Sequence, residues 1–149
     1  MNQAIQSFVQ GKRIAIMGVS RSGKKFGNSI ATELKQRGYQ VLIVHPEAQE
    51  IGGERCYPSM AALPGPVDGV LICVSPKQSA SALREAVQAG VKKIWLQQGA
   101  DSPEALAVAR ELGVSPVTGK CILMYATTGG PIPGLHRFHG IINKLIGQY

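Results

Sequence analysis

Short apolar runs alternate with amphipathic stretches along most of this chain, and this alternation restricts its fold more than any other feature. The apolar runs lie at residues 13–18, 40–45, 69–74, 93–96 and 114–117. Runs this short are typical of strands that are buried on both faces of a parallel sheet. The stretches between them carry apolar residues at helical spacing, as at Phe26, Ile30 and Leu34. We therefore expect an α/β fold, a Rossmann-like open parallel sheet with crossover helices on both faces.

Turn residues mark where these elements begin and end. Gly38 is expected to stop the first helix, and Ser75 with Pro76 to open the second as a cap followed by proline. A helix is predicted to open at 101–104 and run to about Gly113, a turn is predicted at 52–53, and a short helix at 59–63. After residue 121 the alternation ends. Residues 127–134 read as a loop and 135–146 as a terminal helix with an apolar face.

Length and composition agree with one globular domain over residues 1–149, of which 121–149 has no assigned role. Hydrophobic residues make up 44% of the chain and charged residues 17%. No apolar run approaches the ~20 residues of a membrane span, and the first ten residues lack the pattern of a signal peptide. The cysteines, Cys56, Cys73 and Cys121, are widely spaced, which predicts reduced thiols, no metal site and a cytoplasmic location.

Positive charge is concentrated at one place in the sequence. The net charge is +7, and five of the 16 basic residues lie within fourteen positions of one another around a glycine-rich loop: Lys12, Arg13, Arg21, Lys24 and Lys25. Such clustering favours a local site for a small anionic ligand over a general basic coat that would bind nucleic acid or membrane.

The glycine-rich loop spans residues 18–27, between the first strand and the first helix. Here glycine lets backbone amides approach an anion, the helix N-terminus favours negative charge, and Ser20, Ser22, Arg21 and Lys24 add donors. The loop does not match the fingerprint of dinucleotide-binding proteins, because Ser20 replaces its second glycine and no acidic residue ends the second strand. A magnesium-dependent phosphate loop fails, because Lys25 stands where Ser or Thr must bind the ion. A nucleotide diphosphate held without metal remains.

Six segments resemble the stand-alone CoA-binding proteins, which are related to the N-terminal domain of the succinyl-CoA synthetase alpha subunit. They lie at 14–21, 26–28, 38–46, 56–59, 74–76 and 95–99. The resemblance implies coenzyme A or an acyl-CoA as the ligand. Because the sequence shows no paired carboxylates, Ser-His-Asp order or metal-binding set, we expect binding without catalysis. It implies that the loop holds the diphosphate, that residues near Pro46 flank the adenosine, and that residues 74–76 and 96–98 wall the cleft. The candidate ligand-binding residues are Gly18, Val19, Ser20, Arg21, Ser22, Gly23, Lys24, His45, Pro46, Arg55, Val74, Ser75, Pro76, Leu96, Gln97 and Gln98.

Glu47 departs from the family pattern. Many members carry lysine directly after the proline of the second strand, positioned for the 3′-phosphate of the adenosine, whereas this chain has Glu47. Either Arg55 or Lys24 takes over that contact, or the affinity for coenzyme A is reduced.

Two other classes of function stay open. A small NAD(P)- or CoA-dependent enzyme could use Cys121, whose thiolate Lys120 could favour, or His45 at the sheet edge. A nucleic-acid or protein partner module could use the basic charge and the terminal helix, whose apolar face also suggests a homodimer. His136 and His139 have a spacing that can hold metal, but without a third ligand we interpret them as a solvated face.

Overall fold

The computed structural model describes residues 3–126. The helices and strands follow one another along the chain as α1 (Gln3–Gln10), β1 (Arg13–Met17), α2 (Phe26–Gln36), β2 (Gln40–Val44), β3 (Glu50–Ile51), β4 (Glu54–Tyr57), the 3-10 turn η1 (Met60–Ala62), β5 (Gly69–Ile72), α3 (Pro76–Gln88), β6 (Ile94–Gln97), α4 (Pro103–Leu112), β7 (Val117–Lys120) and the 3-10 turn η2 (Ile122–Met124).

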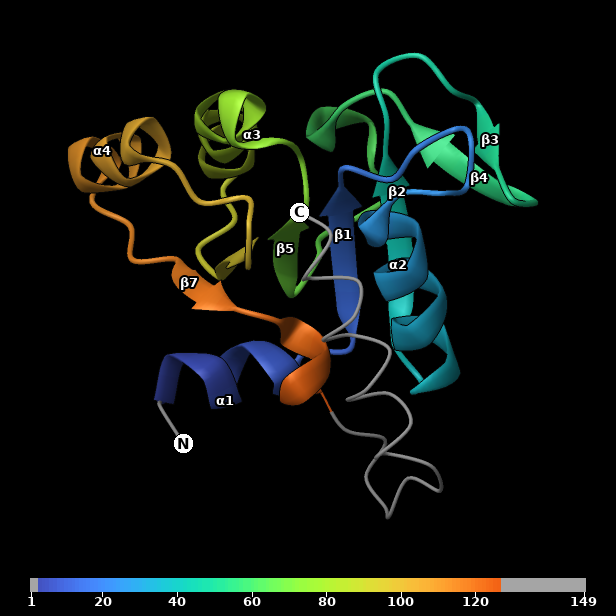
Figure 1. Cartoon of the computed structure of the whole chain (residues 1–149), viewed down its shortest axis with the longest axis horizontal. Coiled ribbons are helices and arrows are strands. Elements are labelled where there is room, and N and C mark those ends of the chain that lie inside the picture. The colour runs from blue at the N-terminus through green and yellow to red at the C-terminus, as the bar shows by residue number, and fades with distance from the viewer. Residues whose placement is uncertain (1–2, 127–149) are drawn as a thin grey trace.

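One seven-stranded sheet forms the middle of the molecule, in the order β3-β4-β2-β1-β5-β6-β7 (Figure 1). All neighbouring strands are parallel except β3 and β4, which form an antiparallel hairpin. The chain first adds strands on one side of β1 and then returns to add β5 on the other side. The strand order therefore reverses between β1 and β5, and the loops that follow these strands flank the point where open α/β sheets bind ligands.

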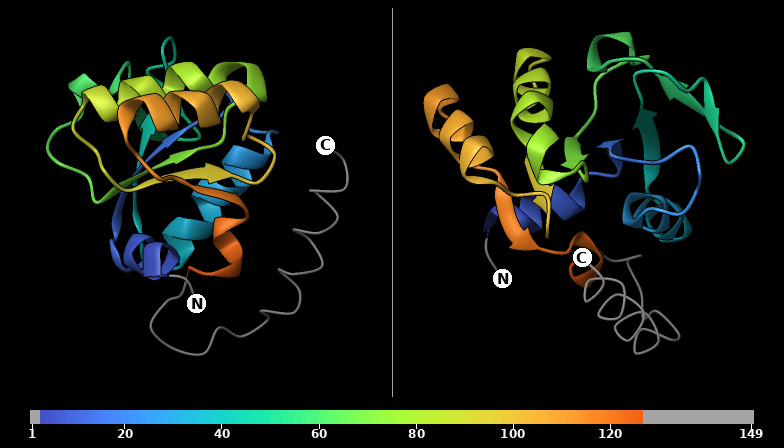
Figure 2. Two further views of the ribbon diagram at one scale, coloured as in Figure 1. Left: turned by 90° about the vertical axis from the view of Figure 1, so that its left-hand side faces the viewer. Right: turned by 45° about the horizontal axis from the view of Figure 1, so that its top comes forward.

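Helices cover both faces of the sheet (Figure 2). On one face, Ile14 and Ile16 of β1 pack in a cluster with residues of α1, α2 and η2. On the other face, Ala15 and Met17 pack with residues of α3 and α4. Because successive side chains of a strand point to opposite faces, one apolar run supplies both cores. The predicted Rossmann-like α/β architecture is confirmed.

The structure differs from the predicted elements in several places. The last strand begins at Val117 rather than at residue 114, because Val114 still donates its amide to Ala109 at the end of α4 and Pro116 has no amide to donate. Helix α1 was not predicted. The hairpin of β3 and β4 was not predicted either, although the turn at Gly52 and Gly53 was. The predicted terminal helix at 135–146 and the loop at 127–134 lie outside the described residues.

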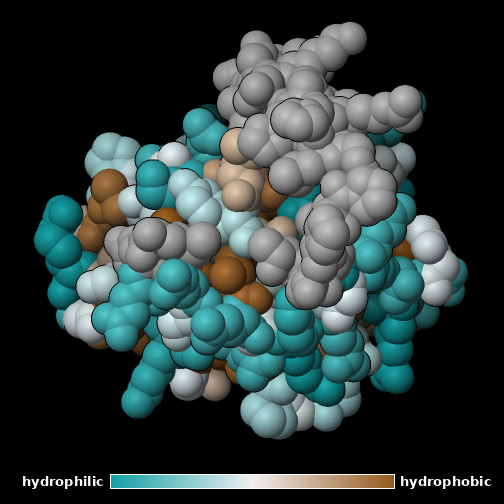
Figure 3. Space-filling model, turned by 90° about the horizontal axis from the view of Figure 1, so that it is seen from below, coloured by the Kyte–Doolittle hydropathy of each residue, from teal (hydrophilic) through white to brown (hydrophobic). Residues whose placement is uncertain are grey.

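The surface of the described residues is mostly polar. Viewed from the side of α1 and η2, hydrophobic residues show only in small patches between hydrophilic ones (Figure 3). Met124 is the one large hydrophobic residue that is exposed within 3–126. No helix in this range is long and apolar enough to cross a membrane.

Candidate functional site at the carboxyl edge of the sheet

The loop after β1 lies directly against the loop after β5. Gly18 has a φ of +104°, and a Cβ atom built there would lie 2.3 Å from the carbonyl carbon of Cys73. A Cβ atom built at Gly27, at the start of α2, would likewise lie 2.5 Å from the carbonyl oxygen of Gly18. Only glycine permits this approach of three backbone segments. The two loops therefore form one continuous wall at the switch point.

Asn28 fixes the course of the loop after β1. The backbone amide of Ser20 donates to Oδ1 of Asn28 at 2.9 Å, and Nδ2 of Asn28 donates to the carbonyl oxygen of Ser20 at 2.9 Å. This pair of bonds ties the loop to the first turn of α2. The sequence motif 26–28 contained Asn28, but no role was predicted for it.

The serine hydroxyls of the loop are already engaged with its own amides. Oγ of Ser20 accepts from the amide of Ser22, and Oγ of Ser22 accepts from the amide of Lys24, at 3.2 and 3.3 Å. The amide of Gly23 donates to the carbonyl oxygen of Ser20. We expected backbone amides to hold the anion, but in this conformation these amides, with that of Ser20, point into the loop.

One hydroxyl proton stays available to a ligand. The two Oγ atoms of Ser20 and Ser22 lie 2.9 Å apart, and this hydrogen bond uses one of their two protons. The other proton can be donated to a phosphate oxygen. Arg21, Lys24 and Lys25 are exposed around the two serines, so the loop offers cationic and hydroxyl donors rather than bare backbone.

An ion pair connects the loop to the segment after β2. Nη2 of Arg21 lies 3.1 Å from Oε2 of Glu47, and both side chains are exposed. The backbone of Glu47 is held in turn by His45, whose Nδ1 accepts from the amides of Glu47 and Ala48 at 3.1 and 2.9 Å. His45 therefore acts on the loop through an acceptor nitrogen, and its Nδ1 is not available to a substrate.

A first hollow lies beyond β5 and β6, with a volume of about 200 Å³ and a mostly apolar lining. Its lining residues are Lys25, Phe26, Gly27, Cys73, Val74, Ser75, Pro76, Gln97, Gln98, Gly99 and Ala100. The N-termini of α2 and α3 border it, and neither has a side-chain cap or an acidic residue in its first turn. By contrast, α4 is capped by Ser102 and carries Glu104 there. The two uncapped termini favour negative charge near this hollow.

Three predicted ligand-binding residues are buried, and of these only Gln97 lines the first hollow. Leu96 is fully buried in the core that faces α3 and α4, and Val19 is buried in the opposite core. Gln97 is 1% exposed, its Oε1 accepts from the amide of Ile122 at 3.0 Å, and its Nε2 has no hydrogen-bond partner among residues 3–126. Hence the side chains of Leu96 and Val19 do not line the cleft. Lys25, Phe26, Cys73 and the glycine at 99 line it, although they were not among the predicted ligand-binding residues.

A second hollow lies beyond β2 and β4, with a volume of about 750 Å³. It is lined by Pro46, Glu47, Ala48, Gln49, Glu50, Gly53, Arg55, Cys56 and Pro58. Arg55 is exposed here and lies over the ring of Tyr57, 5.2 Å from its centroid. Lys24 and Arg55, the two predicted substitutes for the missing family lysine, thus belong to different segments of the edge.

The thiols near the first hollow are not activated. Burial raises the pKa of Cys73, and the neighbouring Cys121 raises it further. Burial also raises the pKa of Cys121, against smaller opposing effects led by the side chain of Gln97. Cys121 is 3% exposed, so it packs as a small apolar residue of the core. A thiolate at either position is disfavoured.

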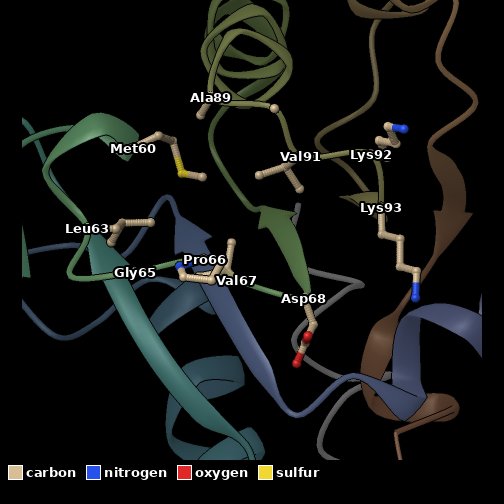
Figure 4. Close-up of a pocket in the computed structure, with 11 residues that line it drawn as sticks. Met60, Leu63, Gly65, Pro66, Val67, Asp68, Ala89, Val91, Lys92 and Lys93 are labelled. Carbon is tan, nitrogen blue, oxygen red and sulfur yellow. The ribbon is translucent and has the colours of Figure 1, made fainter.

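A third hollow, of about 300 Å³, lies at the opposite edge of the sheet, before β5 and β6 (Figure 4). Met60, Leu63 and Val91 form its apolar part, and Lys92 and Lys93 lie at its rim. None of the predicted ligand-binding residues lies there. Within residues 3–126 no three His, Cys, Asp or Glu side chains are grouped to hold a metal ion; His136 and His139 are outside the described range.

Comparison with known proteins identifies similar chains. A family model described as a CoA binding domain matches residues 12–127. The Bacillus subtilis protein YneT is 26% identical over 113 residues, which cover 76% of this chain and 84% of that protein. The ADP-forming acetate–CoA ligase I of Archaeoglobus fulgidus is 31% identical over 126 residues, which cover 78% of this chain but 18% of the ligase. The similarity to the ligase is therefore confined to a small part of its length.

Two solved structures are similar over most of their length. A protein from Pyrococcus furiosus is 40% identical with a TM-score of 0.69, covering 74% of this chain and 96% of that one. A protein from Pyrococcus horikoshii OT3 is 28% identical with a TM-score of 0.75, covering 84% of this chain and 89% of that one.

Proposed function

The chain belongs to the family of CoA binding domains, and on that premise we propose that it binds coenzyme A or an acyl-CoA along the carboxyl edge of its sheet. The observation that carries the proposal is the position of the loop after β1. Its end, Lys25 to Gly27, lines the first hollow, while Arg21 contacts Glu47 in the wall of the second. A ligand with a diphosphate between two dissimilar arms matches a cationic loop between two dissimilar hollows.

The diphosphate is assigned to the loop after β1. Arg21 supplies a planar guanidinium, Lys24 and Lys25 supply ammonium groups, and the pair of Ser20 and Ser22 supplies a hydroxyl proton. The uncapped N-terminus of α2 adds a favourable field for the same charge. No metal ion is needed in this arrangement.

The pantetheine arm, with any acyl group, is assigned to the first hollow. Phe26, Val74 and Pro76 offer apolar contact, and the exposed Ser75 and Gln98 offer hydrogen bonds to its amides. The adenosine is assigned to the second hollow, beside Pro46 and Arg55. We assign this chain a role in holding the ligand rather than converting it, because the thiol of Cys121 is buried and Nδ1 of His45 already accepts two amides.

Isothermal titration of the purified chain with coenzyme A tests the proposal. Arg21→Glu should weaken binding at least tenfold, since it replaces a charge-assisted contact with repulsion. Arg84→Glu is the matched control, because Arg84 forms a similar exposed ion pair with Glu111 on the helices α3 and α4. It should bind within twofold of the wild-type chain.

A panel of nucleotides tests the choice of ligand. Coenzyme A should raise the melting temperature more than NAD⁺, NADP⁺ or ATP at equal concentration, because the ligand with the highest affinity for the folded state stabilises it most. A larger shift with NADP⁺, or equal losses of affinity in Arg21→Glu and Arg84→Glu, would contradict the proposal.

A further inference from the structure

The ion pair between Arg21 and Glu47 places a carboxylate on the guanidinium that is assigned to the diphosphate. The two groups are 3.1 Å apart, and their side chains are 63% and 67% exposed. No buried contact locks the pair, so a phosphate can displace or share it. In this conformation the carboxylate of Glu47 therefore occupies the guanidinium to which the diphosphate is assigned.

The position of Glu47 is set by its backbone. His45 accepts hydrogen bonds from the amides of Glu47 and Ala48, at 3.1 and 2.9 Å. This closes a tight turn directly after β2, so Glu47 stays at the wall of the second hollow when its side chain leaves Arg21. The carboxylate is then left facing whatever occupies that hollow.

The charged groups that line the second hollow are two carboxylates and one guanidinium. Glu47 and Glu50 lie in its wall with Arg55. Glu50 is the strand partner of Arg55 in the hairpin of β3 and β4, and Arg55 also lies over Tyr57. A further anionic group in this hollow meets a net negative wall.

We infer that Glu47 makes the site select CoA-type ligands that lack a phosphate on the ribose, so that dephospho-coenzyme A binds more tightly than coenzyme A. The inference rests on the proposed function, since it takes the adenosine to lie in the second hollow. The diphosphate of both ligands meets Arg21 and the lysines of the loop. Only the 3′-phosphate of coenzyme A adds charge beside Glu47 and Glu50.

Titration of the full chain with both nucleotides at low salt tests the inference. Dephospho-coenzyme A should bind the wild-type chain roughly two- to fivefold more tightly, as expected for exposed charges. In Glu47→Gln both ligands should bind more tightly, because Arg21 is released, and coenzyme A should gain more, so that the ratio of the two dissociation constants falls toward one. High salt should reduce the ratio in the wild-type chain.

Glu111→Gln is the matched control. It removes the carboxylate of another exposed ion pair, Arg84–Glu111, and changes the net charge by the same amount, but lies on α4. It should leave the ratio unchanged. The inference is overturned if the wild-type chain binds coenzyme A more tightly than dephospho-coenzyme A. It is also overturned if the ratio of the two dissociation constants in Glu47→Gln is the same as in the wild-type chain. Either result leaves the proposed function standing. If neither nucleotide binds either chain, the proposed function fails and the inference fails with it.

Discussion

At the scale of single residues, Gly18 decides how closely the loops after β1 and β5 can meet. It combines a left-handed φ of +104° with backbone atoms of Cys73 and Val74 within 2.6 Å of a built Cβ position. Gly23, in the same loop, has a φ of +74° but nothing within 4 Å. The two glycines therefore separate the effect of backbone strain from the effect of close packing.

Gly18→Ala should destabilise the chain by about 3 kcal/mol, because alanine brings both strain and overlap with rigid backbone. Gly23→Ala should cost about 1 kcal/mol, from the left-handed conformation alone. Urea denaturation at equilibrium measures both values. Equal losses would mean that the loop after β5 can move away from Gly18, contrary to the packing seen here.

At the scale of secondary-structure elements, Asn28 links the loop after β1 to α2. It makes one donor and one acceptor bond to the backbone of Ser20, both at 2.9 Å and both partly buried. Because this loop carries the cationic residues assigned to the ligand, its rigidity lowers the entropy that binding must remove.

Asn28→Ala should weaken coenzyme A binding roughly tenfold and lower stability by about 1–2 kcal/mol, since two hydrogen bonds are lost. Thr32→Ala, at an exposed position of the same helix, is the control and should change neither quantity by more than the error of measurement. Calorimetry and urea denaturation provide the two values. An Asn28→Ala chain that binds as tightly as wild type would show that the loop is ordered by other contacts.

The elements differ in how far the sequence could predict them. The strands β1, β2 and β5 are buried on both faces, so each reads as a continuous apolar run between turn residues. The hairpin of β3 and β4 has strands of two and four residues, which are too short for an alternation of apolar and polar residues to be recognised. The predicted loop was found at the sheet edge, but its internal hydrogen bonds depend on where the hydroxyls of Ser20 and Ser22 point. No pattern of residue types specifies that.

The sequence was also unable to predict which residues at the candidate site are buried. Leu96 ends the apolar run 93–96 and Gln98 follows two positions later, and both were expected to face the cleft. Leu96 instead packs under α3 and α4, because β6 lies between β5 and β7 and its apolar side chains are covered on both faces. Which residue is the last one of a buried strand depends on tertiary packing, and periodicity places it only within one or two positions.

At the scale of the whole molecule, exposed lysines of residues 3–126 lie at both edges of the sheet. Lys24 and Lys25 are exposed at the carboxyl edge, and Lys92 and Lys93 are exposed at the amino edge, beside the hollow of Figure 4. A strand of five residues separates the two edges by roughly 15 Å, whereas the Debye length at physiological salt is about 8 Å. Charges at the amino edge are therefore screened from a ligand at the carboxyl edge.

A pair of double variants decides between a local anion site and a general basic coat. Lys24→Glu with Lys25→Glu should weaken coenzyme A binding at least tenfold in 0.15 M salt, because two cations beside the diphosphate become anions. Lys92→Glu with Lys93→Glu alters the net charge by the same four units and should change the dissociation constant less than twofold. If both variants lose affinity alike, and the loss disappears together at high salt, the positive charge acts as a field of the whole surface and the ligand is not held by the loop after β1.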